Sequence, residues 1–163
     1  MAIPVRNSSA ANIKADLRTF FVTTSAWQSR NLLQSHRMAG LLVDVLQHYR
    51  NENQFALHGF VVMPNHPHVL LTLERDVSVE KAAQLIKGGF SFRAKREVGV
   101  PGEIWHRGFS ERRICSEAAF RARQNYMHQN PVRARLVERA EEWEYSSGSG
   151  RYEVDPCPEY LRG

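Results

Sequence analysis

The chain has 163 residues, of which 42% are hydrophobic and 24% are charged. This length and composition are those of one globular domain with a buried core, and they exclude an intrinsically disordered chain. Lysine and arginine outnumber aspartate and glutamate by 22 to 17, and the resulting net charge of +5 favours a polyanionic partner such as nucleic acid only weakly, because modestly basic proteins are common.

The first half of the chain predicts a strand, a helix and a hairpin of two further strands. Residues 18–24 are β-branched and aromatic, which is typical of a strand. Apolar residues recur at helical spacing over residues 36–53. Residues 55–63 are almost all apolar, and a two-residue Pro-Asn turn leads from them into a third strand over residues 66–73.

Residues 76–96 predict a second helix, with Ser78 as its N-cap. We expect Gly88 and Gly89 to bend or loosen this helix, because glycine costs about 1 kcal/mol in a helix interior. Residues 87–96 interleave basic side chains with two phenylalanines. That pattern suits a surface that follows a phosphate backbone and stacks a base, and it suits equally a solvated basic helix end with two core aromatic rings.

The last predicted elements are an interrupted strand and a third helix. The strand comprises residues 104–105 and 110–114. Ser116 is positioned to cap a helix that runs from residue 117 to about residue 129. Pro131 is expected to stop it, because proline disfavours the helical conformation at the residue before it.

The order of elements is therefore β-α-β-β-α-β followed by a helix. This order predicts an α+β fold with a ferredoxin-like, or RRM-like, antiparallel sheet in which the first and third strands are central. We expect residues 1–163 to form one domain with its core at about residues 16–147. The Gly-Ser-Gly sequence at 148–150 is interpreted as a flexible joint, so that residues 148–163 form a C-terminal tail.

The cysteines and the apolar runs indicate the compartment. Cys115 and Cys157 are far apart and form no CxxC pair, so neither a zinc finger nor a disulfide framework is expected. No run approaches the roughly 18 apolar residues of a membrane span. We therefore expect a cytoplasmic protein without a membrane partner.

A His-Pro-His sequence begins the third strand. Alternate residues of a strand point to the same face, so His66 and His68 are expected to lie side by side while Pro67 points the other way. Two imidazoles so presented form half of a site for a divalent metal ion, although two unrelated polar residues at a turn would give the same pattern. If the hairpin turn is tight, His58 lies on the opposite face, as a half-buried strand residue.

Four motifs, in this order along the chain, resemble those of one enzyme family. They are Met-Pro-Asn-His-Pro-His-Val-Leu-Leu at 63–71, Gly-Gly-Phe-Ser-Phe-Arg at 88–93, Ile-Trp-His-Arg-Gly-Phe at 104–109, and Tyr-Met-His-Gln-Asn-Pro-Val-Arg-Ala at 126–134. Over residues 20–147 the chain is similar to the single-tyrosine HUH transposases. It most resembles the REP-associated tyrosine transposases, relatives of the small insertion-sequence transposases.

The resemblance implies a role for four residues. His66 and His68 match the family's metal-binding histidines, Tyr126 matches its helix-borne nucleophile, and Asn130 occupies the place of a third polar ligand. In such enzymes Mg²⁺ or Mn²⁺ polarises a phosphate of single-stranded DNA and the tyrosine attacks, which leaves a 5′-phosphotyrosine and a free 3′-OH. Because a phenol with a pKa near 10 is a weak nucleophile, a cation at the phosphate is what this step most needs.

Two features depart from the family pattern, and a third residue is an alternative ligand. Pro67 stands where a bulky apolar residue is usual, and proline cannot donate to a sheet ladder. Asn130 offers an amide instead of a carboxylate, which makes a weaker metal site. His128 is the alternative metal ligand or proton shuttle, but it points about 200° away from Tyr126 on a helix, so we expect a surface histidine.

Basic residues are the candidates for contacts with the DNA backbone as a group, although each arginine alone is better explained as a solvated side chain. The chosen candidates are Lys87, Arg93, Lys95, Arg96, Arg107, Arg112 and Arg113, and Arg121 and Arg123 belong to the same group.

Three functions are consistent with the sequence. The first is a transposase that cuts and joins single-stranded DNA at palindromic hairpins, acting as a monomer or homodimer without a nucleotide cofactor. The second is a decayed or domesticated nucleic-acid-binding protein on the same fold, which would typically expose aromatic residues on its sheet. The third is a metallohydrolase that uses bound water and has no need of Tyr126. Whether Tyr126 acts within its own subunit is left open.

Overall fold

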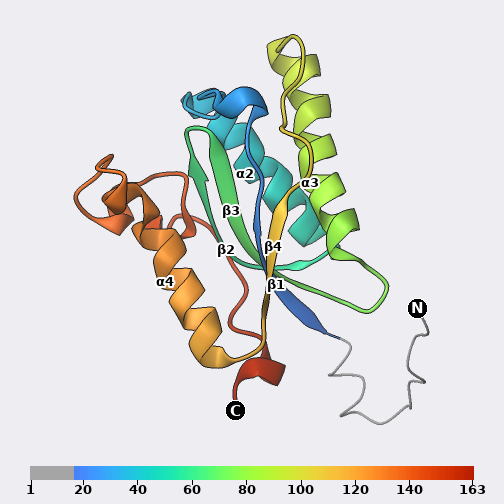
Figure 1. The fold of residues 1–163 in the computed structure, drawn as a ribbon, viewed down its shortest axis with the longest axis vertical. Coiled ribbons are helices and arrows are strands. Elements are labelled where there is room, and N and C mark those ends of the chain that lie inside the picture. The colour runs from blue at the N-terminus through green and yellow to red at the C-terminus, as the bar shows by residue number, and fades with distance from the viewer. Residues whose placement is uncertain (1–16) are drawn as a thin grey trace.

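A four-stranded antiparallel sheet forms the centre of the structure, a computed structural model that describes residues 17–163 (Figure 1). The strands are β1 (Arg18–Thr23), β2 (Ala56–Met63), β3 (His66–Leu73) and β4 (Ser110–Ile114), in the spatial order β2-β3-β1-β4. The predicted fold class is confirmed, as is the central position of the first and third strands. Residue 16, the expected start of the core, lies outside the described residues.

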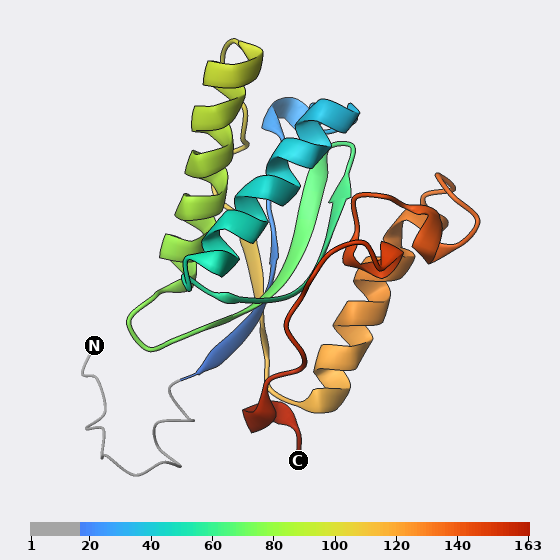
Figure 2. The ribbon, with the colours of Figure 1, turned by 180° about the vertical axis from the view of Figure 1, so that it is seen from behind.

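Three long helices cover the two faces of the sheet. They are α2 (His36–Asn51), α3 (Val79–Arg93), which continues into a π-helical turn (Ala94–Val98), and α4 (Glu117–Arg133). Helices α2 and α3 lie on one face, and α4 lies on the other (Figure 2). Each helix begins at a serine whose hydroxyl accepts a hydrogen bond from the backbone N–H three residues later, namely Ser35, Ser78 and Ser116.

Alternation along β3 divides the buried residues into two layers. Val69 and Leu71 pack with the apolar residues of α2 and α3, whereas Leu70 packs with Phe120 and Met127 of α4. Because His68 is two residues from Leu70, its side chain lies on the α4 face. The periodicity of one strand therefore directs the histidine pair towards the last helix.

The double glycine does not bend α3. The helix runs through Gly88 and Gly89 without interruption, so the expected loosening is wrong. A Cβ atom at Gly89 would lie 3.0 Å from the Tyr49 side chain and 3.3 Å from that of Val45, both on α2. Gly89 therefore lets α2 and α3 approach closely, and this packing outweighs the poor helix propensity of glycine.

Helix α4 also continues past the point where it was expected to stop. Pro131 lies inside the helix and is buried, as is Met127 one turn earlier. The backbone N–H of Ala134 still donates to the Asn130 carbonyl at 3.0 Å. The proline removes one donor within the last turns only, so the helix continues through it.

His58 lies on the α4 face of the sheet, and the prediction of the opposite face is wrong. The β2–β3 register shifts between Leu57 and Gly59, which pair with consecutive residues of β3, so His58 is the extra residue of a bulge. Its ring makes an edge contact with Phe120 of α4, with centroids 5.2 Å apart. Its Nε2 lies 2.6 Å from the hydroxyl oxygen of Thr72. The residue is buried, close to the half-buried structural role expected for it.

The segment after Gly150 is bound to the sheet. The Asp155 carboxylate accepts hydrogen bonds from the Leu57 backbone N–H at 2.8 Å and from the Arg50 guanidinium at 2.9 and 3.1 Å. Cys157 and Leu161 are buried in the α4-side layer. The residues expected as a tail thus complete that layer. None of the described helices has the length and apolarity to cross a membrane.

Candidate active site

The β2–β3 hairpin presents His66 and His68 next to each other. A two-residue turn sets the register so that Met63 lies opposite His66 and Val61 opposite His68, as expected. The two imidazole centroids are 4.8 Å apart. Strand β3 is flanked by β2 and β1, so the backbone that holds the pair is fixed from both sides.

Each imidazole is oriented by a hydrogen bond at Nδ1. His66 donates from Nδ1 to the side-chain oxygen of Asn65 at 2.6 Å. The Nδ1 of His68 lies 2.6 Å from the hydroxyl oxygen of Thr23 on β1. Such contacts fix the tautomer and the ring orientation of metal-binding histidines and leave Nε2 as the ligand atom. The sequence reasoning did not identify these two partners; the Asn that precedes the first histidine was the available signal.

Burial keeps both imidazoles neutral. Desolvation lowers the pKa of His66. Burial also lowers the pKa of His68 to about 3, with smaller contributions from the charges of His66, Arg133 and Arg123. His68 is 7% exposed. Because only the neutral ring binds a metal ion, the pair is ready to act as ligands at neutral pH.

Pro67 is accommodated at the edge of a ladder. Strand β1 pairs with β3 only as far as Thr23, opposite His68, so Pro67 lies one residue beyond that ladder. The residues that close a two-residue turn form a hydrogen-bonded pair, and the next pair, Val62 and Pro67, directs its N–H and C=O groups outward. The backbone nitrogen of Pro67 therefore points to the β1 side of the strand, where β1 no longer pairs with β3. No ladder hydrogen bond is lost there, and the histidine pair is undisturbed.

Helix α4 brings Tyr126 to the histidine pair of its own chain. The Tyr126 ring lies 5.9 Å from the ring of His68 and 6.1 Å from that of Phe21, and both contacts are edge-on. Phe21 in turn stacks on His68 at 5.0 Å. Tyr126 is 40% exposed, which is unusual for a large aromatic residue in this structure and leaves it accessible to a substrate. Tyr126 and the histidine strand thus lie side by side in the structure.

Two arginines of α4 contact the Tyr126 ring. The guanidinium carbon of Arg133 lies 4.3 Å from the ring centroid, and that of Arg123 lies 5.5 Å from it. Arg123 was named among the DNA-binding candidates, but Arg133 was not. Its position seven residues after Tyr126, on the same face of the helix, was the signal that would have identified it.

The residues present fit a divalent cation with an incomplete set of protein ligands. The described residues contain no cluster of three His, Cys, Asp or Glu side chains suited to a metal ion. Asn130 follows Tyr126 by one turn of α4 and is half-buried. Two neutral imidazoles would leave the remaining positions of a cation to an amide, to water or to phosphate oxygens, which is the open arrangement that a catalytic cation needs.

The side chain of His128, on α4, packs against the segment that follows this helix. Its Nε2 is 2.7 Å from the hydroxyl oxygen of Ser147. Burial lowers the pKa of His128. The expectation of a surface histidine is therefore wrong, because the chain after α4 folds back over this side of the helix. A Cβ atom at Gly148 would lie 3.0 Å from the His128 ring, so a glycine is needed for this approach.

Two of the DNA-binding candidates are engaged within the protein. The Lys87 ammonium donates to the backbone carbonyls of His106 at 3.0 Å and Gly108 at 2.8 Å, and burial lowers its pKa. Arg93 forms an ion pair with Glu97 at 2.7 Å. These contacts hold the loop before β4 and the end of α3, respectively.

The other candidates are exposed, namely Lys95, Arg96, Arg107, Arg112 and Arg113. Arg112 lies opposite Phe21 in the sheet register, which places it on the α4 face together with Tyr126. Arg96 lies 5.8 Å from the ring of Phe92, which is 63% exposed on α3. The contact of these residues with DNA stays a prediction.

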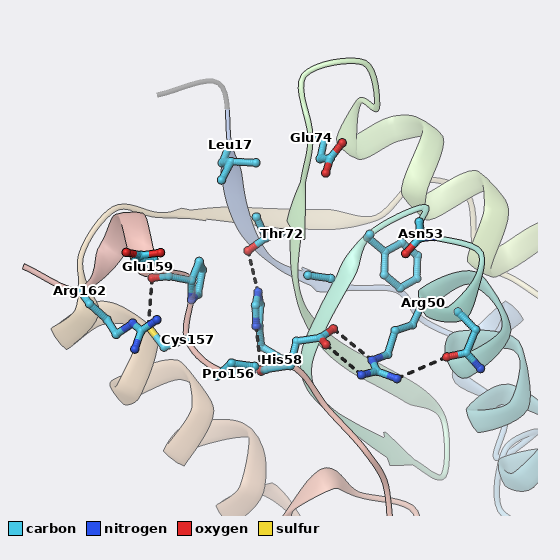
Figure 3. A pocket seen from close by; sticks show the side chains of 15 residues that line it. Leu17, Arg50, Asn53, His58, Thr72, Glu74, Pro156, Cys157, Glu159 and Arg162 are labelled. Carbon is cyan, nitrogen blue, oxygen red and sulfur yellow. Dashed lines mark hydrogen bonds and ion pairs between the residues drawn. The ribbon is translucent and has the colours of Figure 1, made fainter. Parts of the chain in front are cut away.

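A pocket of about 620 Å³ lies away from the histidine pair (Figure 3). It is formed by the beginning of β2, the end of β3 and the C-terminal segment, and neither His66, His68 nor Tyr126 lines it. Two of its charged groups are used within the protein, since Arg50 pairs with Asp155 at 2.9 Å. The candidate active site, where α4 meets β3, is therefore separate from this cavity.

Comparison with known proteins agrees with this geometry. The family model described as IS200-like transposase matches residues 18–130, a segment that contains both histidines, Tyr126 and Asn130. A REP-associated tyrosine transposase bound to a REP hairpin is 24% identical, with 88% of this chain and 87% of that chain covered and a TM-score of 0.67. A proposed transposase from Deinococcus radiodurans is 19% identical, with 68% and 88% covered and a TM-score of 0.52. At these identities the two structures show a shared fold. No curated protein matches the chain.

Proposed function

This chain belongs to the IS200-like transposase family and is a DNA transposase, and we propose that it cuts and joins single-stranded DNA through a covalent bond to Tyr126. The observation that carries the proposal is the contact between Tyr126 on α4 and His68 on β3, at a ring distance of 5.9 Å. A partly exposed tyrosine beside two neutral, oriented histidines suits nucleophilic attack on a phosphate next to a metal ion.

The proposed reaction is a transesterification. The hydroxyl oxygen of Tyr126 attacks the phosphorus of the scissile phosphodiester and becomes bonded to the 5′ end of one DNA segment. The bond to the 3′ oxygen of the other segment breaks, that oxygen takes up a proton, and the phenol proton passes to solvent. The reverse attack by a 3′-OH rejoins DNA. One phosphodiester replaces another, so strand transfer needs no nucleotide cofactor.

His66, His68 and Asn130 would hold the divalent cation, Mg²⁺ or Mn²⁺. When bound there, the cation would neutralise charge on the scissile phosphate. The chain contributes the orientation of the two imidazoles through Asn65 and Thr23. It also keeps both rings neutral by burial. A ligand set with only one amide beside the histidines predicts weak metal binding in the absence of DNA.

Single-stranded DNA is the proposed substrate, with a hairpin as its recognised feature. Tyr126 lies on α4 where this helix packs on the sheet. The phosphate of a flexible single strand is easier to place there than that of a duplex. The related tyrosine transposase was solved with a REP hairpin, which supports the same class of partner here. The net charge of +5 agrees with such a partner.

The two alternative functions are less well supported. An RRM-like binding protein would use an open sheet face, but α4 and the C-terminal segment cover the face that carries His68. A metallohydrolase acting through bound water would leave the packing of Tyr126 against His68 without a use.

The polarity of the cleavage tests the proposal. A hairpin-containing oligonucleotide from the flanks of the gene is labelled at its 3′ end or at its 5′ end and is incubated with the protein and Mn²⁺. We expect the 3′ label to appear in a protease-sensitive protein–DNA adduct and the 5′ label in a shorter strand that ends in a free 3′-OH. A protein-free labelled fragment with the 3′ label as well as with the 5′ label would instead indicate hydrolysis.

A further inference from the structure

Two cations enclose the ring of Tyr126. The Arg133 guanidinium lies over the ring at 4.3 Å and donates a hydrogen bond to the Tyr126 backbone carbonyl at 2.7 Å. The Arg123 guanidinium lies 5.5 Å from the same ring and 5.3 Å from the ring of Phe21. Both side chains therefore lie where the phenol and the histidine strand meet.

Neither of these two arginines forms an ion pair with a carboxylate of the described residues. The arginines that form ion pairs with Asp or Glu side chains are Arg50, Arg93, Arg121, Arg139 and Arg151. Within the described residues, no carboxylate oxygen lies within 4.0 Å of the Arg123 or Arg133 guanidinium nitrogens. Stacking on an aromatic ring leaves the edge of a guanidinium, with its donors, available for an anion.

The positive charge extends to the metal-binding pair. The Tyr126 ring, which both guanidinium groups contact, lies 5.9 Å from the ring of His68. Phe21, which Arg123 also contacts, stacks on His68 at 5.0 Å. Two uncompensated cations thus act on the same small region as two neutral imidazoles. An anion placed between Tyr126 and His68 would be stabilised by both arginines, because no described carboxylate is paired with either of them.

We propose that Arg123 and Arg133 bind the scissile phosphate of single-stranded DNA, and that Arg133 also fixes the plane of the Tyr126 ring. This inference rests on the proposed function and extends it to two residues beyond the metal-binding histidines. The guanidinium groups hold the non-bridging oxygens of one phosphodiester while the stacked phenol is presented to its phosphorus. Arg133 is then both a substrate-binding and a positioning residue.

A purely structural role makes a different prediction. If the arginines only hold the Tyr126 ring, their removal changes the affinity for every DNA by the same factor. That change then does not depend on whether any one phosphate is charged. The test is therefore a comparison of charged and uncharged phosphates at single positions. It is carried out with a chelator present, so that no metal ion contributes to phosphate binding, and with Tyr126→Phe, which keeps the ring but prevents attack.

The probes are hairpin-containing single-stranded oligonucleotides from the flanks of the gene, each with one neutral methylphosphonate at a different position. We expect one position to weaken binding to Tyr126→Phe about tenfold, the effect of one charge-assisted contact. In Tyr126→Phe with Arg123→Gln and Arg133→Gln added, the same methylphosphonate should change affinity less than twofold. In this triple variant the slope of log affinity against log salt concentration should be less steep than in Tyr126→Phe by about 0.7, the value expected for one phosphate of a single strand.

Arg139→Gln is the matched control. Arg139 follows α4 in the chain, is exposed, and is paired with Glu141 and Glu142. Its removal should leave the tenfold methylphosphonate effect intact. The thermal unfolding midpoint of each variant confirms that the fold is retained.

Two results would overturn the proposal. One is that no single methylphosphonate weakens binding to Tyr126→Phe; the other is that the position-specific loss persists in the double arginine variant. Failure of the covalent mechanism is a separate result. A chain that forms no adduct, but shows one arginine-dependent phosphate, would keep this phosphate site while the proposed function fails.

Discussion

The ring of Tyr126 on α4 lies 5.9 Å from the ring of His68 on β3, at an interplanar angle of 65°. Phe21 contacts both rings from the neighbouring strand β1. The proposed nucleophile and a proposed metal ligand, from distant parts of the sequence, are therefore held together through one shared aromatic residue. The packing of α4 on the sheet, and not a loop, positions the two groups.

The hydroxyl of Thr23 is expected to support metal binding by orienting His68. Thr23→Val removes the partner of Nδ1 at 2.6 Å and should lower Mn²⁺ affinity 10- to 100-fold, the usual effect of losing such a contact. The measurement is a Mn²⁺ titration followed by calorimetry.

Thr24→Val is the control for this change. The Thr24 hydroxyl is buried without a hydrogen-bond partner among the described residues, so its removal should leave metal affinity unchanged and should not destabilise the fold. Equal losses of Mn²⁺ affinity in Thr23→Val and Thr24→Val would contradict the orienting role.

The stability of the fold is expected to fall as the pH decreases from about 6.5 towards 3. Burial, followed by the charges of His66, Arg133 and Arg123, lowers the pKa of folded His68 to about 3, whereas an unfolded histidine titrates near 6.5. Below pH 6.5 the unfolded chain therefore binds more protons than the folded chain. This difference costs about 2 kcal/mol at pH 5 for one such group, and the contribution is fully restored above pH 6.5.

Urea unfolding of the metal-free protein at pH 7.5 and pH 5 measures this effect. His68→Gln should lose less stability between the two values than the wild type, because one of the groups that titrate only on unfolding is absent. An identical loss in both proteins would show that His68 is protonated in the folded state at pH 5.

The adjacent glycines of α3 should respond oppositely to alanine. At Gly88 nothing lies within 4 Å of an added Cβ atom, so Gly88→Ala should stabilise the protein by up to about 1 kcal/mol through helix propensity. At Gly89 the added atom would lie 3.0 Å from Tyr49, so Gly89→Ala should destabilise it by about 1–3 kcal/mol. Unfolding free energies of the two variants check the pair; stabilisation by both would mean that α2 and α3 are not in close contact.

The C-terminal segment should contribute to stability through Asp155. Its carboxylate accepts hydrogen bonds from Arg50 and from the Leu57 backbone, so Asp155→Ala should cost about 1–3 kcal/mol, with the lower values expected because the group is partly exposed. Glu153→Ala is the comparison, since that side chain is 83% exposed and pairs only with the same arginine. Denaturant unfolding should show a change below about 0.5 kcal/mol for Glu153→Ala, and equal costs would argue against the role of Asp155.

The parts of the fold that depend on short-range patterns were predictable from the sequence. Strand alternation put His66 and His68 on one face, and the two-residue turn set their partners on β2. The bulge at His58 was not predictable, because it arises from the contacts of that ring with α4 and with Thr72 across the sheet. The continuity of α3 at Gly89 likewise depends on Tyr49 of another helix.

The candidate site divides in the same way. The histidines and Tyr126 were indicated by motifs, whereas Thr23 and Arg133 were not, since their roles depend on where β1 and the last turn of α4 lie in space. Arg133 reaches the Tyr126 ring only because α4 continues through Pro131. The conformational preference of the residue before proline predicted that the helix would end there.

Formation of the covalent adduct tests the central claim most directly. A labelled single-stranded hairpin from the flanks of the gene is incubated with Mn²⁺ and with wild type, Tyr126→Phe or His68→Ala, and is run on a denaturing gel. We predict a slow, protease-sensitive adduct with the wild type that is lost without metal and in both variants, while Tyr126→Phe still binds the DNA. Cleavage that persists in Tyr126→Phe, or an adduct that forms without the histidine, would contradict the account.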